Sequence, residues 1–116
     1  MPTILVVDDE RTIRMLVRLT LEPHGYDVVE AAEGFEALAL AEAHHPDLAL
    51  LDVALPQLSG LEIARRLGDS TPVLFLTGLP PDDEAIDGPG IRGSIEKPFS
   101  PDALLQRIEE TLESVA

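Results

Sequence analysis

The sequence predicts a three-layer, doubly wound α/β domain in which helices cover both faces of a parallel sheet. Short apolar runs alternate with segments of helical periodicity through five rounds. The runs are continuously apolar, which is typical of strands that are buried on both faces of a parallel sheet. With 116 residues, the chain is expected to form a single domain over residues 1–116 and to carry no output domain.

The first predicted strand, Thr3–Val7, ends at two acids, Asp8 and Asp9. The next segment, Glu10–Leu21, has the apolar spacing of a helix, and a proline and a glycine end it. Its predicted inward face consists of Ile13, Leu16, Val17 and Thr20. An isolated acidic pair at such a boundary is best explained as a helix cap, so the pair alone does not indicate a site.

Asp27–Ala31 is predicted to form the second strand, and Gly34–His44 the second helix. We expect Phe35, Leu38 and Ala39 to point inward from this helix. The chain's three histidines lie at helix ends without other ligands nearby in the sequence, so we expect solvated side chains there rather than a metal site. They are His24, His44 and His45.

Leu48–Leu51 is the third predicted strand, and it delivers Asp52 to its carboxyl end. A loop with Pro56 leads to a short helix whose predicted inward residues are Leu61, Ile63, Ala64 and Leu67. Pro72–Thr77 is the fourth predicted strand, and it ends in a hydroxyl followed by glycine.

Prolines and glycines crowd residues 78–93, which excludes a regular helix of full length. At most Pro81–Ile86 is expected to form a helical turn, so the fourth helix should be short or irregular. Ser94–Lys97 is a brief fifth strand that ends in the only lysine. The last helix begins at Ser100-Pro101, and its predicted buried stripe is Leu104, Ile108, Leu112 and Val115.

Composition favours a cytoplasmic protein. The chain has no cysteine, no apolar run long enough to span a bilayer and no signal-like start. Eight basic and 22 acidic residues give a formal net charge of -14, which should repel nucleic acid and anionic membranes. We therefore expect neither direct nucleic acid binding nor membrane association.

Because parallel strands end at one edge, five polar side chains are predicted to meet there: Asp8, Asp9, Asp52, Thr77 and Lys97. Three close carboxylates repel one another unless a cation joins them, and Mg²⁺ prefers such oxygen ligands. A free carboxylate can attack phosphorus and form an aspartyl phosphate. A hydroxyl and an ammonium beside it could bind the phosphate oxygens.

These residues resemble the receiver domain of bacterial two-component response regulators. The resemblance rests on Asp8-Asp9, Asp52 with a downstream proline and glycine, Thr77-Gly78 and Lys97-Pro98-Phe99, and it extends over essentially the whole chain. It implies a flavodoxin-like (βα)5 fold with strand order 2-1-3-4-5. It further implies phosphorelay signal transduction, in which Asp52 accepts a phosphoryl group from a histidine kinase or a histidine phosphotransfer protein.

The resemblance also implies a ligand set for Mg²⁺: Asp9, Asp52 and the backbone carbonyl of Ala54, with Asp8 acting through water. Thr77 and Lys97 would contact the phosphate, and the Lys97-Pro98 peptide would be cis. The domain would act as a conformational switch on a downstream protein target or a fused output domain. It would be no enzyme beyond promoting its own phosphorylation and dephosphorylation.

Two departures from the family pattern bear on signalling. Ser94 stands where receivers usually have the aromatic residue that changes rotamer on activation, so we expect an atypical output face. Ala54 and Leu79 occupy positions that influence hydrolysis of the acyl phosphate in the family. Because both are apolar and cannot orient water, we predict a comparatively long-lived phosphoprotein.

The sequence disfavours three other functions. A magnesium-dependent aspartyl-phosphate phosphatase would need a second acid two residues after the nucleophile, where this chain has Ala54. A flavin-binding module would need a Ser/Thr-rich phosphate loop after Val7 and more aromatic residues than Tyr26 outside the core. A receiver-fold scaffold without phosphorylation is disfavoured because all five site residues are present.

Overall fold

The computed structural model describes residues 1–55, 57–78 and 88–115. Within these ranges five parallel strands form one sheet in the order β2-β1-β3-β4-β5, as the resemblance implied. The strands are β1 (Thr3–Val7), β2 (Asp27–Ala31), β3 (Leu48–Asp52), β4 (Val73–Thr77) and β5 (Ile91–Glu96). The predicted doubly wound architecture is confirmed.

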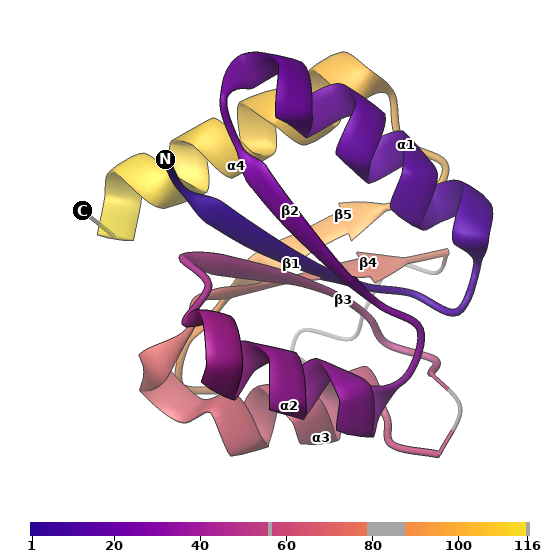
Figure 1. The fold of residues 1–116 in the computed structure, drawn as a ribbon, viewed down its shortest axis with the longest axis vertical. Helices are drawn as coiled ribbons and strands as arrows, with labels where there is room; N and C mark the ends of the chain where they lie inside the picture. The colour runs from indigo at the N-terminus through magenta and orange to yellow at the C-terminus, as the bar shows by residue number, and fades with distance from the viewer. Residues whose placement is uncertain (56, 79–87, 116) are drawn as a thin grey trace.

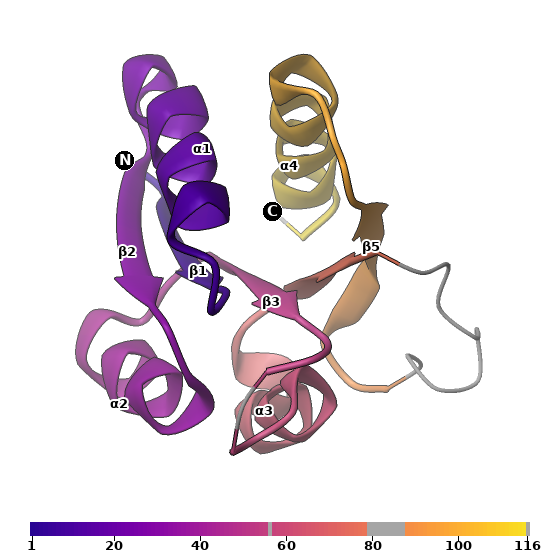
Figure 2. The same cartoon turned by 90° about the vertical axis from the view of Figure 1, so that its right-hand side faces the viewer.

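The described α-helices are α1 (Arg11–Leu21), α2 (Gly34–His44), α3 (Gly60–Leu67) and α4 (Pro101–Val115). Figures 1 and 2 show α1 and α4 on one face of the sheet and α2 and α3 on the other. Short 3₁₀ helices, Glu22–His24 and Gly68–Ser70, extend the ends of α1 and α3. The sheet is thus buried on both sides, which explains why its strands are continuously apolar.

Alternate residues of each central strand supply two separate cores. In β1, Ile4 and Val6 join the core beneath α1 and α4, while Leu5 and Val7 join the core above α2 and α3. All four side chains are essentially inaccessible to solvent. The strands therefore form a rigid base, and each polar residue at a strand end projects from a fixed backbone position.

The predicted inward face of α2 was wrong in part. Phe35 is 54% exposed and Ala39 is exposed, whereas Gly34, Ala37 and Ala41 are buried. Gly34 approaches the following β3–α3 loop so closely that an added Cβ would lie 2.6 Å from the Cβ of Leu58. Small residues let this helix pack tightly, and the larger aromatic ring is left on the outer side.

The bounds of β4 and β5 also differ from the prediction. The fifth strand begins at Ile91 instead of Ser94 and ends one residue before Lys97, and β4 begins one residue after Pro72. Gly93, the last residue of the predicted segment rich in proline and glycine, lies inside β5 with φ of 136° and pairs with Leu74. The glycine tolerates this backbone conformation, so the strand continues through it.

Some predictions concern residues outside the described ranges. The expected helical turn at Pro81–Ile86, and with it the short or irregular fourth helix, lies there, as do Pro56 and Leu79. In the part of the chain that the structure does describe, no helix has both the length and the apolar character required to cross a membrane.

Candidate functional site

The carboxyl ends of the strands bring the predicted polar residues to one edge of the sheet. The register pairs Val7 of β1 with Leu51 of β3, and Asp52 of β3 with Leu76 of β4. Thr77 of β4 pairs with Glu96 of β5. Residues that follow these positions by one step therefore emerge beside one another, as expected for a parallel sheet.

Asp52 is the last residue of β3 and is only 8% exposed. Its Oδ1 accepts a hydrogen bond from the backbone N–H of Ala54 at 3.0 Å, and its Oδ2 lies 3.4 Å from the Nζ of Lys97. Burial, reinforced by the negative charge of Asp8, raises the pKa of Asp52, although the Ala54 N–H and Lys97 partly oppose this shift. The Asp52 carboxylate is thus held in a fixed position, and Lys97 balances its negative charge only in part.

Asp8 is fully buried directly after β1. Its Oδ2 accepts a hydrogen bond from the Nζ of Lys97 at 2.6 Å, and its Oδ1 accepts one from the backbone N–H of Glu10 at 2.9 Å. Asp8 is therefore not the cap of α1, because the capping position is Glu10, whose side chain makes no capping hydrogen bond. A buried carboxylate with these two donors is fixed in orientation.

Lys97 links two of the strand-end acids. Its ammonium group contacts both Asp8 and Asp52, and its backbone N–H donates to the carbonyl of Thr77 at 2.7 Å. Burial lowers the pKa of Lys97, but its hydrogen bond to Asp8 and the charges of both acids outweigh burial and raise it. The Lys97-Pro98 peptide is cis, as the resemblance implied.

Asp9 is exposed next to Asp8, and a third acid joins them. Carboxylate oxygens of Asp8, Asp9 and Glu10 lie within 4.8 Å of one another, which makes this trio a candidate metal-binding group among the described residues. Glu10 was not among the predicted site residues, because exposed acids commonly occur at the start of a helix without binding a ligand. Its adjacency to the acidic pair was the only available signal.

The donor chemistry of this edge fits Mg²⁺. The acidic trio supplies only carboxylate oxygens, and Asp52 with the exposed Ala54 lies across Lys97 from Asp8. Hard oxygen ligands, with water completing the shell, are what Mg²⁺ prefers. Receiver domains bind Mg²⁺ at an acidic pocket of this kind.

Thr77 and Ser94 complete the inventory of predicted positions. Thr77 ends β4 and is half-buried, and Gly78 after it is exposed. Ser94 is half-buried within β5, where it pairs with Phe75 of β4. The structure thus brings Asp8, Asp52, Thr77 and Lys97 to one edge of the sheet, with Asp9 at its exposed rim.

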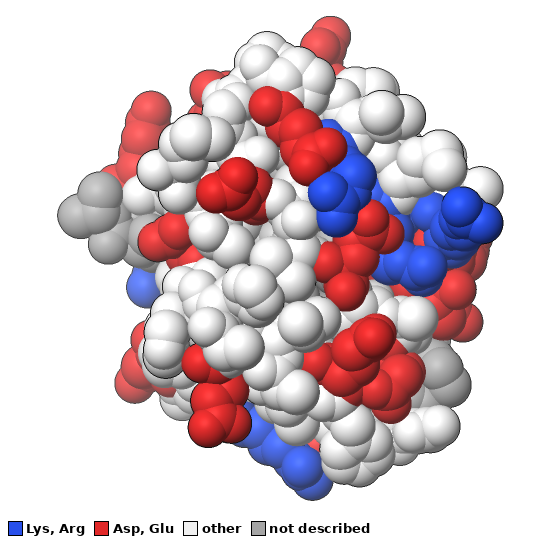
Figure 3. All heavy atoms as spheres, viewed as in Figure 1, with Lys and Arg blue, Asp and Glu red and all other residues white. Residues whose placement is uncertain are grey.

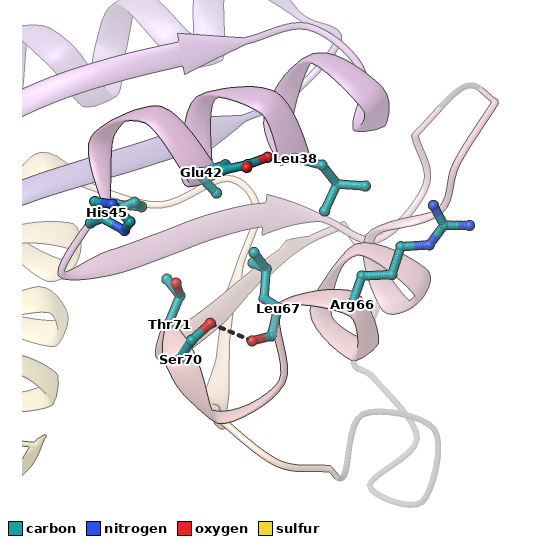
Figure 4. A pocket seen from close by; sticks show the side chains of 9 residues that line it. Leu38, Glu42, His45, Arg66, Leu67, Ser70 and Thr71 are labelled. Atoms are coloured by element: carbon teal, nitrogen blue, oxygen red, sulfur yellow. Dashed lines mark hydrogen bonds between the residues drawn. The ribbon is translucent and has the colours of Figure 1, made fainter.

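A separate cleft lies between α2 and α3 (Figure 4). It has a volume of about 460 Å³, and its lining combines Leu38 and Leu67 with the charged Glu42 and Arg66. His45 and Thr71, which also line it, precede the amino ends of β3 and β4. The cleft includes none of the five predicted site residues, and it extends toward the sheet edge opposite the acidic cluster.

The face shown in Figure 3 carries no extended patch of basic groups alone. Acidic groups are scattered over that face, and the basic groups visible there lie beside acidic ones. Ion pairs among the described residues include Arg18–Glu22 and Arg66–Glu62. This distribution agrees with the strongly negative net charge of the sequence.

Comparison with known proteins identifies the family. The model of the response regulator receiver domain matches residues 4–109. The alkaline phosphatase synthesis transcriptional regulatory protein PhoP of Bacillus subtilis is 41% identical over 114 residues, which cover 94% of this chain and 48% of that protein. Response regulator MprA of Mycobacterium sp. (strain KMS) is also 41% identical, over 94% of this chain and 50% of its own length.

Solved structures agree with this assignment. The chemotaxis response regulator CheY4 of Vibrio cholerae superposes with a TM-score of 0.88 at 35% identity, covering 96% of this chain and 98% of that one. The present chain spans about half the length of the curated relatives that it matches. Together, the matched family model, these relatives and the sheet order show that the chain belongs to the response regulator receiver domain family.

Proposed function

We propose that this chain is a phosphoacceptor switch in which Asp52 receives a phosphoryl group from a histidine kinase or a histidine phosphotransfer protein. The observation that carries the proposal is the environment of Asp52. Its buried carboxylate lies 3.4 Å from the ammonium of Lys97, which also binds Asp8. This arrangement supports the proposal, because a carboxylate that could act as a nucleophile lies beside a cation and a second acid at the carboxyl edge of the sheet.

The proposed transfer uses the groups already described. An oxygen of Asp52 attacks the phosphorus of a phosphohistidine, the P–N bond breaks, and its electron pair stays on the imidazole nitrogen. Lys97 would balance negative charge on the transferred group, and the Thr77 hydroxyl would donate a hydrogen bond to it. Bound Mg²⁺ would supply further charge compensation, with Asp8, Asp9, Asp52 and the carbonyl of Ala54 as its proposed ligands.

Receiver domains of response regulators are generally signalling switches and not enzymes. We propose that this one promotes only its own phosphorylation and dephosphorylation. An aspartyl-phosphate phosphatase would need an acid at position 54 to protonate the leaving group, and the residue there is Ala54. For the same reason, no polar side chain at that position could direct water toward the acyl phosphate.

We propose that the signal is transmitted by contact between this domain and another protein or domain. Response regulators pair with histidine kinases and output domains, and we propose a single receiver domain over residues 1–116 that acts in the cytoplasm on a protein target or a fused output domain. We propose no direct binding of nucleic acid or membrane by these residues, because the net charge of -14 opposes both.

The output surface is proposed to be atypical. Ser94 cannot act as an aromatic switch, so another surface would transmit the change. Met15 and Leu19, one helical turn apart on α1, are 47% and 66% exposed. Two exposed apolar side chains on one helix support α1 as a surface for protein contacts.

Acetyl phosphate tests the proposed function directly. The chain should gain the mass of one phosphoryl group when it is incubated with acetyl phosphate and Mg²⁺. Asp52→Asn should abolish the gain, because an amide oxygen is a poor nucleophile toward phosphorus. Asp69→Asn changes an exposed acid in the 3₁₀ helix after α3 and serves as the matched control. An undiminished gain in Asp52→Asn would overturn the assignment.

A further inference from the structure

Arg14 connects helix α1 to the acidic turn after β1. Its NH1 donates a hydrogen bond to the backbone carbonyl of Asp8 at 2.7 Å, and its Nε donates to Oε1 of Glu30 at 3.1 Å. The side chain is only 16% exposed. The guanidinium therefore spans from the end of β2, where Glu30 lies, to the end of β1.

The carbonyl that Arg14 binds belongs to the peptide joining Asp8 to Asp9. Because a peptide unit is planar, fixing this carbonyl also fixes the plane from which Asp9 emerges. The Asp8 N–H donates to the carbonyl of Ala31 at 3.2 Å, and the Asp8 side chain is held by Lys97. Asp9 is exposed, and no described residue binds its side chain, so the backbone at Asp8–Asp9 is what limits the positions that its carboxylate can reach.

Glu30 keeps Arg14 in place. Oε1 of Glu30 accepts from Arg14, and Oε2 accepts from the Nε of Arg18 at 2.7 Å. Arg18 in turn donates to the carbonyl of Val28 at 3.1 Å, so both carboxylate oxygens of Glu30 are bound by arginines that also bond the backbone. Burial would raise the pKa of Glu30, but its hydrogen bonds and charge contacts with Arg18 and Arg14 lower it, so the carboxylate stays ionised.

We propose that Arg14, held by Glu30, is a positioning residue for Mg²⁺: it orients the Asp8–Asp9 peptide so that the Asp9 carboxylate points toward the cation. The inference rests on the proposed magnesium-dependent function and adds a residue to it that touches neither the metal nor the phosphoryl group. Residues that orient metal ligands commonly affect metal affinity by about 10–100-fold.

Arg14 could affect Mg²⁺ binding through its charge or through the orientation of the Asp8–Asp9 peptide, and the two roles predict opposite effects of Arg14→Gln. Arg14 is a cation beside a cation site, so its charge alone weakens Mg²⁺ binding. Arg14→Gln would then tighten binding if charge were its only role. If it orients the peptide, Arg14→Gln weakens binding despite the lost repulsion. Arg14→Lys keeps the charge but cannot donate to Asp8 and Glu30 in the same forked geometry, so it also weakens binding.

Arg18→Gln is the matched control. It removes the other arginine bound to Glu30 from the same helix, but Arg18 has no hydrogen bond to Asp8 among the described residues. Isothermal titration with MgCl₂ should show about tenfold weaker binding for Arg14→Gln and Arg14→Lys than for the unaltered chain, and a much smaller change for Arg18→Gln. Thermal unfolding in EDTA would verify that each variant is folded.

The outcomes separate this inference from the proposed function. If the unaltered chain binds Mg²⁺ and is phosphorylated by acetyl phosphate, the proposed function stands whatever Arg14 does. Equal or tighter Mg²⁺ binding by folded Arg14→Gln would then overturn only the positioning role. Should Arg14→Gln fail to fold, Arg14→Lys decides: unchanged affinity in that variant contradicts the inference. Absence of Mg²⁺ binding by the unaltered chain would defeat both.

Discussion

The ammonium nitrogen of Lys97 lies 2.6 Å from Oδ2 of Asp8, a carboxylate that is completely buried and 89 positions away in the sequence. The same nitrogen lies 3.4 Å from Asp52. Lys97 therefore offsets the repulsion between two acids at adjacent strand ends. This relationship couples the stability of the fold to the site where phosphorylation is proposed.

Lys97→Met should destabilise the fold measurably. It leaves the buried carboxylate of Asp8 without its ionic partner, and removal of one member of a buried pair costs about 3 kcal/mol of unfolding free energy. Urea unfolding in EDTA provides the measurement. Asp8→Asn combined with Lys97→Met removes both charges and should recover part of the loss. A single variant as stable as the unaltered chain would show that the contact contributes little.

The free energy of unfolding should depend on pH through the titration of Asp52. Its pKa is raised in the folded state, mainly by burial, so the folded chain holds that proton more tightly than the unfolded chain. The carboxylate therefore lowers stability progressively as pH rises above the usual Asp pKa of about 3.9. Urea unfolding would measure this: as pH rises above that value, the free energy of unfolding of the unaltered chain should fall relative to that of Asp52→Asn. The control Asp69→Asn should follow the unaltered chain, and a parallel course for Asp52→Asn would contradict the pKa shift.

The two phenylalanines on the α2 and α3 side of the sheet should differ in their effect on stability. Phe75→Ala removes a side chain with no exposed surface and should cost about 3 kcal/mol or more. Phe35→Ala should cost about 1 kcal/mol or less, since the ring is half-exposed and its described charged neighbour is Arg66, 6.0 Å away. Denaturant midpoints would compare them. Equal losses would show that Phe35 packs inward in solution.

The acyl phosphate should persist for a comparatively long time. Ala54 donates its N–H to Asp52, but its methyl side chain cannot orient an attacking water. Ala54→Glu should shorten the lifetime of the phosphoprotein in Mg²⁺, and Ala54→Val, which stays apolar, is the control. Lifetimes can be followed by intact mass after removal of acetyl phosphate. Rapid decay of the unaltered phosphoprotein, or equal decay in Ala54→Glu, would contradict this account.

The fold could be predicted because its signals are local. Each apolar run ends at a polar residue, and the parallel geometry determines that these ends share one edge. The same logic located Asp8, Asp52, Thr77 and Lys97. The inward face of α2 could not be predicted in the same way: its apolar residues surround the helix, so periodicity favours no side. The close approach of Gly34 to Leu58 determines which face of α2 points inward.

Other features depend on contacts between distant segments. Nothing in the sequence near Ile91 indicates that β5 begins there, because pairing with β4 extends the strand through Gly93. The hydrogen bond from Arg14 to the Asp8 carbonyl likewise depends on how α1 returns across β1. A periodicity argument identifies which residues reach the sheet edge, but not which backbone atoms their neighbours bind.

Chemical trapping of the phosphorylated residue would show directly whether Asp52 carries the phosphoryl group. Borohydride reduces an aspartyl phosphate to homoserine, which peptide mass spectrometry can locate after treatment with acetyl phosphate and Mg²⁺. We expect homoserine at position 52 alone, and none there when acetyl phosphate is omitted. Modification at another acid of the cluster, such as Asp8 or Asp9, would contradict the account.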